Sequence, residues 1–568
     1  MSNPIYVLGT GLSHDGSSCL LKDGKILVAI EKERLSRRKH DGGNDSLTIQ
    51  YCLDYAGITI ADLSLVVQAA HFEKESIRKE SYQGKRSFTA DCTIPFISIS
   101  HHLAHAYSAI GTSPFDECNV MVIDGSGSFL QQCDDLDNIA IPAEINTATN
   151  AYAEKTSFYF FNGKTMQPLQ KDFSVIRYDH NHGEVFLPTT RHSIGGLYAM
   201  ASNYCFGDFH QAGKLMGLAP YGDRTIYKDE LFLLRDGRVW VNEEVMRLHF
   251  TDPADHNDHS LYDNFEYYAG IAKWVQEETE KAILYLFQQS IESHPHENMC
   301  YAGGVALNAV SNSKILQSLP GIKNLYIEPA AGDNGLAIGC AYYGWLQVLQ
   351  KEKVKHSGST FFGRPYKNEE IEKAIDDHTI DLPGKKISFK KDKNYIATTA
   401  GYLAAGKTIG WFQQGAEFGP RALGRRSILA NPAVKDIRQH INNDIKFRED
   451  FRPFAPAVLH EDKDLYFQIG FESPYMILID KIKNEWKDKM PGIVHVDGTC
   501  RVQTVKDKEE PLYELLTAFK QITGTSVLLN TSFNCKGMPI VETPEEAISF
   551  FYKCDLDVLV MDEYIIVK

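Results

Sequence analysis

The stretch Tyr6-Val-Leu-Gly-Thr-Gly-Leu-Ser-His-Asp-Gly16 begins with a short apolar run and ends in small and polar residues. Apolar runs of this length that stop at turn residues are typical of buried strands. Two further runs, 18–21 and 25–30, lie on either side of Asp23-Gly24, a dipeptide that favours a tight hairpin turn. The opening of the chain therefore predicts a strand, a polar turn that contains His14, and an antiparallel pair of strands.

Further along the chain, apolar runs alternate with helix-like stretches. Helices are predicted at 48–56, 102–110, 268–292 and 334–350, and short strands at 119–124, 299–303 and 324–328. This alternation is typical of α/β proteins. Residues 353–364 have the composition of a linker, and we therefore predict domains at 1–355 and 356–568. The second domain mixes helices with strands and ends on predicted strands at 558–561 and 564–567. The polar and aromatic segment 136–190 has no clear assignment and could be an insertion with its own hairpins.

The composition narrows the class of protein. The chain has 568 residues, a formal net charge of −15, 43% hydrophobic residues and 23% charged residues. These values are typical of globular proteins, and the acidic excess argues against a general nucleic-acid or membrane surface. The 11 cysteines form no CxxC pair, which favours buried thiols in a reducing compartment. No apolar stretch approaches about 20 residues, and no signal-peptide pattern is present, so a cytoplasmic location is predicted.

A candidate metal site begins at His101-His-Leu-Ala-His105. Two histidines four residues apart share one face of a helix and can bind the same ion. Asp124 follows a predicted strand and opens a glycine-rich turn, and Asp333 lies among small residues at a predicted helix start. Two histidines and two aspartates form a mixed set suited to Fe(II), Mn(II) or Zn(II). The alternative is that the two aspartates only cap helices or form turns.

Three glycine-rich turns could bind nucleotide phosphates through their backbone N–H groups. None of them is a Walker A loop, and each could instead be a tight packing turn. Together they suggest an ATP site, with candidate residues Gly125, Ser126, Gly213, Lys214, Gly303, Gly304 and Asn308. A separate basic run at 32–40 is read either as a solvated helix face or as part of a functional site.

The second domain contains an unusual concentration of basic residues. Arginines and one lysine are interleaved with Phe, Pro and Gly in segments 413–427 and 446–456. The planar guanidinium group matches the oxygen atoms of phosphate or carboxylate groups. His495, Arg501 and the polar run 530–534 add further donors. This pattern favours an anion-binding site, and the alternative is a structural network of arginines with carboxylates.

Together these segments resemble the NodU/CmcH-type O-carbamoyltransferases, which carbamoylate hydroxyl groups of antibiotics and Nod factors. The resemblance covers nearly the whole chain and includes 13–15, 31–40, 101–105, 124–125, 213–222, 303–308, 331–333, 419–427, 446–456 and 530–534. It implies an α/β protein with an N-terminal actin-like (ASKHA) two-lobed ATPase domain and a C-terminal YrdC-like domain. A strand, polar turn and strand is also how actin-like ATPase domains begin.

The resemblance implies a two-site reaction. Carbamoyl phosphate would be cleaved in the C-terminal domain, and the carbamate would react with ATP and Mg²⁺ to give carbamoyl-adenylate. The carbamoyl group would pass, shielded from water, to a hydroxyl of a small-molecule acceptor beside a metal ion in the N-terminal domain. The implied metal is Fe(II), with Mn(II) as the alternative. No nucleic acid or membrane partner is expected, and the protein would be a monomer or homodimer.

The resemblance also implies roles for individual residues. His14 would be the general base, because an imidazole can accept a proton near neutral pH. Lys39 would meet a phosphate or the adenylate. The metal ligands would be His101, His105, Asp124 and Asp333. The carbamoyl phosphate site would be lined by Arg421, Lys446, Arg448, Arg452, His495, Arg501, Ser532 and Asn534.

Three other functions fit parts of this pattern. A tRNA threonylcarbamoylation enzyme is disfavoured by the acidic charge, and a hydrogenase-maturation carbamoyltransferase by the absence of CxxC motifs. A nucleotide-binding module without turnover is disfavoured by the complete set of donor-site residues. The acceptor itself is not readable from the sequence. Segment 150–192, with its aromatic residues and Asp179-His-Asn-His-Gly183, is the hypothetical place where it binds.

Overall fold

The computed structural model describes residues 3–43, 46–69, 93–143, 145, 152–175, 193–224, 227–242, 244–245, 258–378, 388–468 and 470–568. The chain forms two compact units. Unit 1 consists of Met1–Lys32 and His40–Ser359, and unit 2 consists of Glu33–Lys39 and Thr360–Lys568. The main division between the two units falls after Ser359. The sequence did not predict that residues 33–39 group with unit 2.

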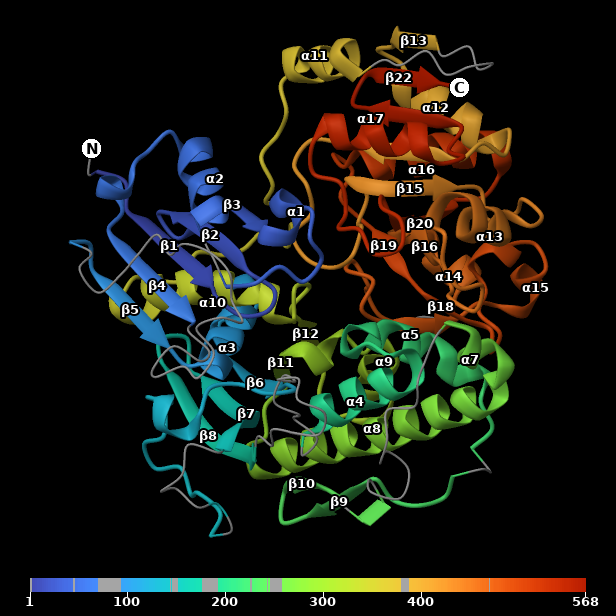
Figure 1. Cartoon of the computed structure of the whole chain (residues 1–568). Helices are drawn as coiled ribbons and strands as arrows, with labels where there is room; N and C mark the ends of the chain where they lie inside the picture. Colours follow the sequence, from blue (N-terminus) through green and yellow to red (C-terminus); the bar gives the residue numbers. More distant parts are fainter. Residues whose placement is uncertain are drawn as a thin grey trace. The chain divides into compact units, whose positions relative to one another are not determined.

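Unit 1 contains two five-stranded sheets of the same topology (Figure 1). The first has the order β3-β2-β1-β4-β5, with β1 Tyr6–Gly11, β2 Ser17–Lys22, β3 Lys25–Glu31, β4 Leu65–Ala69 and β5 Phe96–Ile99. The second has the order β12-β11-β6-β7-β8, with β6 Cys118–Ile123, β7 Tyr152–Phe161, β8 Met166–Val175, β11 Asn298–Ala302 and β12 Asn324–Ile327. Counted along the chain, the first three strands of each sheet (β1–β3 and β6–β8) form antiparallel pairs. The last two strands of each sheet (β4 and β5, and β11 and β12) run parallel to its first strand. This repeat confirms the predicted two-lobed actin-like arrangement.

Two helices between these sheets carry or position the residues of the candidate site described below. Helix α3, His101–Thr112, packs on the second sheet, and α10, Leu336–Tyr343, packs on β1 and on α3. The two helices approach closely because residue 339 is glycine. A Cβ atom there would lie 1.7 Å from the carbonyl oxygen of Ala104. This contact brings the segment before α10 next to the first turn of α3.

The remaining elements of unit 1 lie mainly around a long helix. The helices are α2 Ser46–Ala56, α4 Ile194–Phe206, α5 Ala212–Leu218, α7 Asp258–Asp263, α8 Phe265–Ser293 and α9 Ala309–Ser318, and the strands are β9 Phe232–Arg235 and β10 Arg238–Val241. Helix α8 contacts α4, α5 and α9. The helices and strands predicted for this unit are confirmed within a few residues at their ends. Within the unassigned segment 136–190, strands β7 and β8 belong to the second five-stranded sheet and do not form a separate hairpin. Asp179–Gly183 of the same segment lies outside the described residues.

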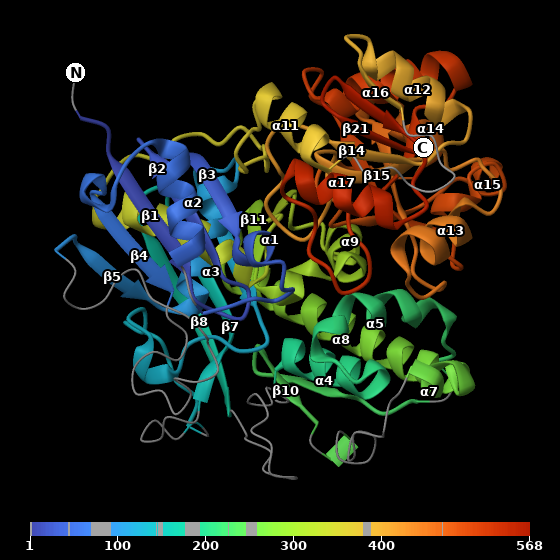
Figure 2. The same cartoon turned by 45° about the horizontal axis from the view of Figure 1, so that its top comes forward.

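Unit 2 is built on one eight-stranded mixed sheet, which Figure 2 shows from a second direction. Its order is β13-β22-β21-β14-β15-β20-β16-β19, with β13 Ser388–Lys391, β22 Tyr564–Val567, β21 Val558–Met561, β14 Ile409–Phe412, β15 Arg426–Ala430, β20 Val527–Ser532, β16 Ala455–Leu459 and β19 Gln503–Val505. A small sheet pairs β17, Ile479–Lys481, with β18, Thr499–Arg501. The helices are α11 Asn368–His378, α12 Tyr395–Ala404, α13 Ile437–His440, α14 Lys463–Tyr466, α15 Asn484–Lys487, α16 Pro511–Thr523 and α17 Pro544–Lys553.

Both faces of this sheet are buried. Side chains alternate between the two faces along each strand, so neighbouring residues of one strand pack in two different cores. Ile409 and Trp411 pack in the core that includes residues of α12 and α16. Phe412 of the same strand packs in the opposite core with residues of α11 and α17. Helices on both faces of a mixed sheet give the α/β architecture expected for this part of the chain.

Residues 33–39 include most of α1, Lys32–Ser36, and are anchored within unit 2. Arg34 is 1% exposed and donates to the carbonyl oxygen of Gly419 at 3.0 Å. Arg37 donates to the carbonyl oxygens of Ile540 and Pro539 at 2.8 and 2.9 Å. Arg34 and Arg37 of the basic run therefore do not belong to a solvated helix face, whereas Arg38 and Lys39 are exposed. Across the described ranges, every helix is too short or too polar to span a lipid bilayer.

Glu328, directly after β12, is expected to make the stability of unit 1 depend on pH. Its carboxylate accepts hydrogen bonds from Thr112 Oγ1 at 2.5 Å and the Ala330 amide at 3.2 Å, and burial raises its pKa to about 7. The unfolded-state pKa is about 4.3, so the folded state binds the proton more tightly. The resulting stabilisation is complete below about pH 4.3 and is lost as the pH rises through about 7.

Glu328→Gln keeps a neutral side chain of the same shape at every pH. Between pH 5 and pH 8 the wild type should lose about 3 kcal/mol of unfolding free energy through Glu328, whereas the variant should not show this loss. Urea unfolding at both pH values measures this difference. Parallel pH dependences of the two proteins would contradict the assignment.

Candidate active site

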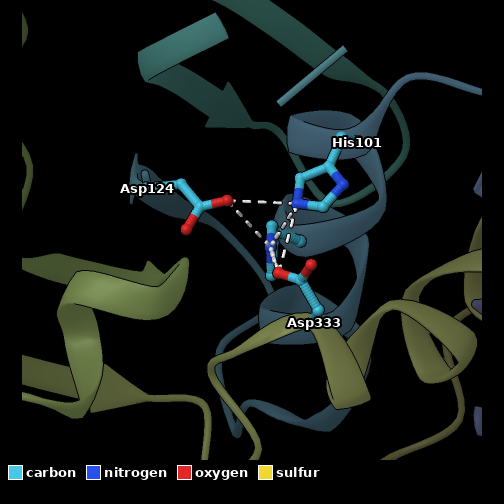
Figure 3. A group of neighbouring side chains, drawn as sticks. His101, Asp124 and Asp333 are labelled. Atoms are coloured by element: carbon cyan, nitrogen blue, oxygen red, sulfur yellow. Dashed lines mark hydrogen bonds and ion pairs between the residues drawn. The ribbon is translucent and has the colours of Figure 1, made fainter. Parts of the chain in front are cut away.

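Four side chains in unit 1 converge at one buried point (Figure 3). His101 and His105 come from the first turns of α3, and Asp124 follows β6. Asp333 begins the short 3-10 helix Asp333–Gly335 that precedes α10. Their exposed fractions are at most 7%. The close packing of α10 on α3 therefore unites residues from three distant parts of the sequence.

The distances within this cluster fit a single cation. His101 Nε2 lies 3.1 Å from Asp124 Oδ2 and 3.3 Å from Asp333 Oδ1. His105 Nε2 lies 3.8 and 3.6 Å from the same two oxygen atoms, and 3.2 Å from His101 Nε2. Ligands about 2.1 Å from one shared ion lie roughly 3.0–3.4 Å apart. Two imidazole nitrogens and two carboxylate oxygens at these separations are a suitable set for a divalent transition metal.

The electrostatics of the cluster also favour a cation. Burial opposes protonation of His101, but Asp333 and Asp124 outweigh it and raise the pKa of His101 to about 10. The pKa of each aspartate is correspondingly lowered, although burial alone would raise it. The two carboxylates therefore attract positive charge to this point, and a metal ion can take the place of the proton.

His102, the middle histidine of the motif, points elsewhere. Its Nδ1 lies 2.8 Å from Ser157 Oγ, and burial lowers its pKa to about 3. His102 is therefore a neutral side chain of the core. Helical periodicity places His102 on a different face of α3 from His101 and His105.

His14 lies beside the same cluster. Its Nδ1 is 3.1 Å from Asp333 Oδ2, which also accepts a hydrogen bond from Ser13 Oγ, and its Nε2 is 3.4 Å from Asp15 Oδ2. The side chain is 47% exposed, and its partial desolvation opposes protonation, but Asp333 and Asp15 outweigh this and raise the pKa of His14 to about 10. A divalent cation on Asp333 would counteract this rise, because it neutralises the carboxylate.

Two further histidines near His14 were not among the predicted site residues. His40 Nδ1 lies 2.9 Å from Asp15 Oδ1, and the His40 ring stacks on His210 at 4.2 Å. The ring of His210 is 5.5 Å from that of His14. His40 could have been found from the basic run at 32–40, whereas nothing local distinguishes His210 from a surface histidine.

Three of the predicted nucleotide-binding residues of unit 1, Gly303, Gly304 and Asn308, make contacts that stabilise the local fold. Gly303 has a φ of 92°, and a Cβ atom there would lie 2.3 Å from the Ile123 carbonyl oxygen. The Gly304 amide donates to Asp124 Oδ1 at 3.0 Å. Asn308 caps α9 through the Ser311 amide. The glycine-rich turn at 303–304 thus holds the candidate metal ligand Asp124 in place.

The other nucleotide candidates are placed as follows. The hydroxyl of Ser126 is buried and has no hydrogen-bond partner among the described residues. The carbonyl oxygen of neighbouring Gly125 accepts from Ser193 Oγ at 2.7 Å. Lys214 is buried above the ring of Phe206, and a Cβ atom at Gly213 would meet open space.

Unit 2 contains the predicted basic site. Lys446 is 3% exposed, and its Nζ donates to the Ser532 carbonyl oxygen at 2.5 Å, to Ser532 Oγ at 3.1 Å and to Asn534 Oδ1 at 2.8 Å. The next residue, Phe447, has the left-handed φ of 51°, and Arg448 Nε donates to Asn442 Oδ1 at 2.8 Å. His495 is buried, with Nε2 3.3 Å from the Phe451 carbonyl oxygen.

The arginines of this site outnumber their carboxylate partners. Arg421, Arg448, Arg452 and Arg501 interact electrostatically with one another, and Glu449 is 3.7 Å from Arg452. Neither Arg421 nor Arg501 forms an ion pair with any described residue, and the Nε atom of each is buried without a partner. Burial and Arg452 lower the pKa of Arg421 to about 10, and burial together with Arg421, Arg448 and Arg452 holds the pKa of Arg501 well below its usual value. Such an uncompensated cluster is suited to an anion.

Two arginines of the same sequence segment have only structural contacts. Arg425 donates to the Gln414 carbonyl oxygen at 2.5 Å and to Glu510 at 2.7 Å. Arg426 is fully buried, lies over the Phe412 ring and donates to backbone carbonyl oxygens. These two arginines therefore fit the alternative interpretation of the basic segments, in which arginines form a structural network.

Lys39 belongs to unit 2, whereas the other nucleotide candidates belong to unit 1. It lies near enough to Lys446 that its charge contributes to lowering the pKa of the Lys446 ammonium group, after burial, Arg448 and Arg452. The anchored segment 33–39 therefore adds a further cation to the basic site.

Comparison with known proteins gives matches along most of the chain. The family model described as Carbamoyltransferase N-terminus matches residues 7–93 and 59–342, and Carbamoyltransferase C-terminus matches residues 400–568. Nodulation protein NolNO of Sinorhizobium fredii is 31% identical over 98% of this chain and 79% of its own. An uncharacterized protein of Synechocystis sp. is 32% identical over 99% of this chain and 97% of its own. Nodulation protein U of Rhizobium tropici is 28% identical, with 94% and 91% of the chains covered.

Proposed function

The chain belongs to the carbamoyltransferase family and is a carbamoyltransferase enzyme, and from this premise we propose that it transfers the carbamoyl group of carbamoyl phosphate to a hydroxyl group in an ATP-dependent reaction. Water would cleave carbamoyl phosphate to carbamate and phosphate. Carbamate would attack the α-phosphorus of ATP, with release of pyrophosphate. The hydroxyl oxygen would then attack the carbonyl carbon of carbamoyl-adenylate and release AMP, and the hydroxyl proton would be taken up by a base.

The uncompensated arginine cluster of unit 2 carries this proposal. Arg421, Arg448, Arg452 and Arg501 offer forked donors to the phosphate group, and Lys446 places an ammonium group beside Ser532 and Asn534. Donors fixed in this way stabilise the charge that develops on a departing phosphate. His495 and Lys39 belong to the same proposed site.

The acceptor reaction is assigned to unit 1. His101, His105, Asp124 and Asp333 would hold a divalent metal ion, which supplies Lewis-acid polarisation when bound. His14 donates through Nδ1 to Asp333 in one tautomer, and the unprotonated Nε2, which lies 3.4 Å from Asp15 Oδ2, would accept the hydroxyl proton. Ser126, with the neighbouring backbone and Lys214, is proposed to contact the nucleotide. Iron is the metal that we propose, with manganese as the alternative.

An exchange experiment tests the donor reaction without knowledge of the acceptor. The purified protein is incubated with ATP, Mg²⁺ and labelled pyrophosphate, with or without carbamoyl phosphate. Because adenylation is reversible, we expect label to enter ATP only when carbamoyl phosphate is present. Exchange that requires bicarbonate and threonine instead would favour the threonylcarbamoyl alternative. The absence of any exchange, with Fe(II) or Mn(II) supplied, would contradict the proposal.

A further inference from the structure

A buried charged network lies in unit 1 behind the metal-site helix. Lys171, on β8, is fully buried, and its Nζ lies 2.6 and 2.7 Å from the Asp135 carboxylate oxygens and 2.5 Å from Glu154 Oε1. The Tyr159 hydroxyl is 3.3 Å from the same nitrogen and donates to Asp135 at 2.9 Å. Lys171 thus fixes one oxygen of Glu154, while the other remains available to different donors.

The second oxygen of Glu154 holds two backbone segments that lead to metal ligands. Oε2 accepts the Ser128 amide at 2.9 Å and the His102 amide at 3.2 Å. Ser128 Oγ in turn accepts the His101 amide at 2.9 Å. The Ser128 amide ends the turn that begins at Asp124, and the His101 and His102 amides belong to the first turn of α3. One carboxylate oxygen therefore connects the turn after Asp124 to the helix that carries His101 and His105.

The backbone around Glu154 tightens this connection. The Gly127 amide donates to the Glu154 carbonyl oxygen at 2.8 Å, and the Glu154 amide donates to Ser128 at 3.0 Å. A Cβ atom at residue 127 would lie 2.7 Å from Glu154 Oε2 and from His102 Cδ2. Glycine is therefore required there for the carboxylate to reach both amides.

The charge of Glu154 also suits this position. The first turn of a helix leaves its amide groups without intrahelical partners, and a carboxylate there is favourable. Burying a carboxylate is costly unless it is paired, and Lys171 provides the pair. Neither Glu154, Lys171 nor Ser128 belongs to the candidate ligand set, so the network would act on the ligands through the backbone.

We propose that Glu154, held by Lys171, is a positioning residue that sets His101 and Asp124 at the separation needed to bind one metal ion. This inference rests on the proposed metal site of unit 1. Removal of a residue that hydrogen-bonds to metal ligands typically weakens metal binding about 10–100-fold. Glu154 and Ser128 act on the ligand set in the same way, through amide groups.

Metal binding tests the inference without reference to turnover. Co(II) is titrated into the full-length protein, and affinity and the visible d–d spectrum are recorded. We expect Glu154→Ala to weaken Co(II) binding about 10–100-fold and to alter the spectrum, and Ser128→Ala to do so more weakly. Glu154→Gln is expected to retain affinity within about 3-fold, because its amide oxygen can accept the same two N–H groups.

Tyr159→Phe is the matched control, because it removes a hydroxyl from the Lys171 network without touching an amide that Glu154 holds. It should lower the melting temperature and leave Co(II) affinity unchanged. Unchanged affinity in both Glu154→Ala and Ser128→Ala, or equal losses in Glu154→Gln and Glu154→Ala, would overturn the inference. Failure of the wild type to bind Co(II), Fe(II) or Mn(II) would instead remove the proposed metal site itself. Ser128→Ala keeps the test available if Glu154→Ala does not fold.

Discussion

Replacing His101 by alanine is expected to weaken divalent-metal binding by more than about 100-fold and to reduce carbamoyl transfer by about 1000-fold. His101 Nε2 is the nitrogen closest to both aspartate oxygens, at 3.1 and 3.3 Å. Removal of a ligand should cost more than removal of an outer partner, which costs about 10–100-fold. Loss of about 4 kcal/mol of charge stabilisation in the transition state corresponds to about 1000-fold in rate.

His102→Gln is the matched control for this variant. It replaces a histidine in the same helical turn whose ring is directed toward Ser157 and away from the metal cluster. We expect this change to reduce stability but to leave metal content and transfer rate within a few-fold of the wild type. Metal content by elemental analysis and transfer rates under metal-saturating conditions are the measurements. Full activity of the His101→Ala protein would exclude the assigned centre.

Arg501→Met should change ligand binding and stability in opposite directions. Arg501 lies beside Arg421, Arg448 and Arg452, and burial together with these cations lowers the pKa of its guanidinium group. A cation whose pKa is lower in the folded state destabilises that state at neutral pH. Removing the charge should therefore raise the melting temperature of the ligand-free protein by about 2–4 °C, the shift that about 1 kcal/mol produces.

The same change should weaken binding of carbamoyl phosphate or inorganic phosphate about 10–100-fold, because a hydrogen bond to a charged group contributes about 1.5–3 kcal/mol. Calorimetric titration and thermal unfolding with and without phosphate measure the two effects. Arg425→Met is the control, since Arg425 is paired with Glu510 at 2.7 Å. That variant should lose stability and keep its affinity. If Arg501→Met bound phosphate as tightly as the wild type, the proposed donor site would be wrong.

Much of the local structure could be predicted from the sequence. The apolar runs at 119–124, 299–303 and 324–328 became β6, β11 and β12. Such runs report burial on both faces of a strand, which depends on residues close in sequence. The pairing of His101 with His105 was predictable for the same reason, because helical periodicity alone places them on one face.

Other site features could not be predicted, because their partners are distant in sequence. Nothing local separates Arg421 and Arg501, which have no ion-pair partner among the described residues, from Arg425, which pairs with Glu510. His210 joins His14 and His40 only through folding, and Glu154 lies in a strand whose sequence gives no sign of its contact with α3.

The sequence by itself determined the α/β class, the main helices and strands, the helical histidine pair and the family to which the chain belongs. Tertiary structure decided which of these residues share a site. Asp333 reaches His101 because Gly339 lets α10 approach α3, and Lys39 joins Lys446 because Arg34 and Arg37 anchor residues 33–39 in unit 2. Periodicity and turn chemistry act over a few neighbouring residues, whereas these contacts depend on how whole elements pack.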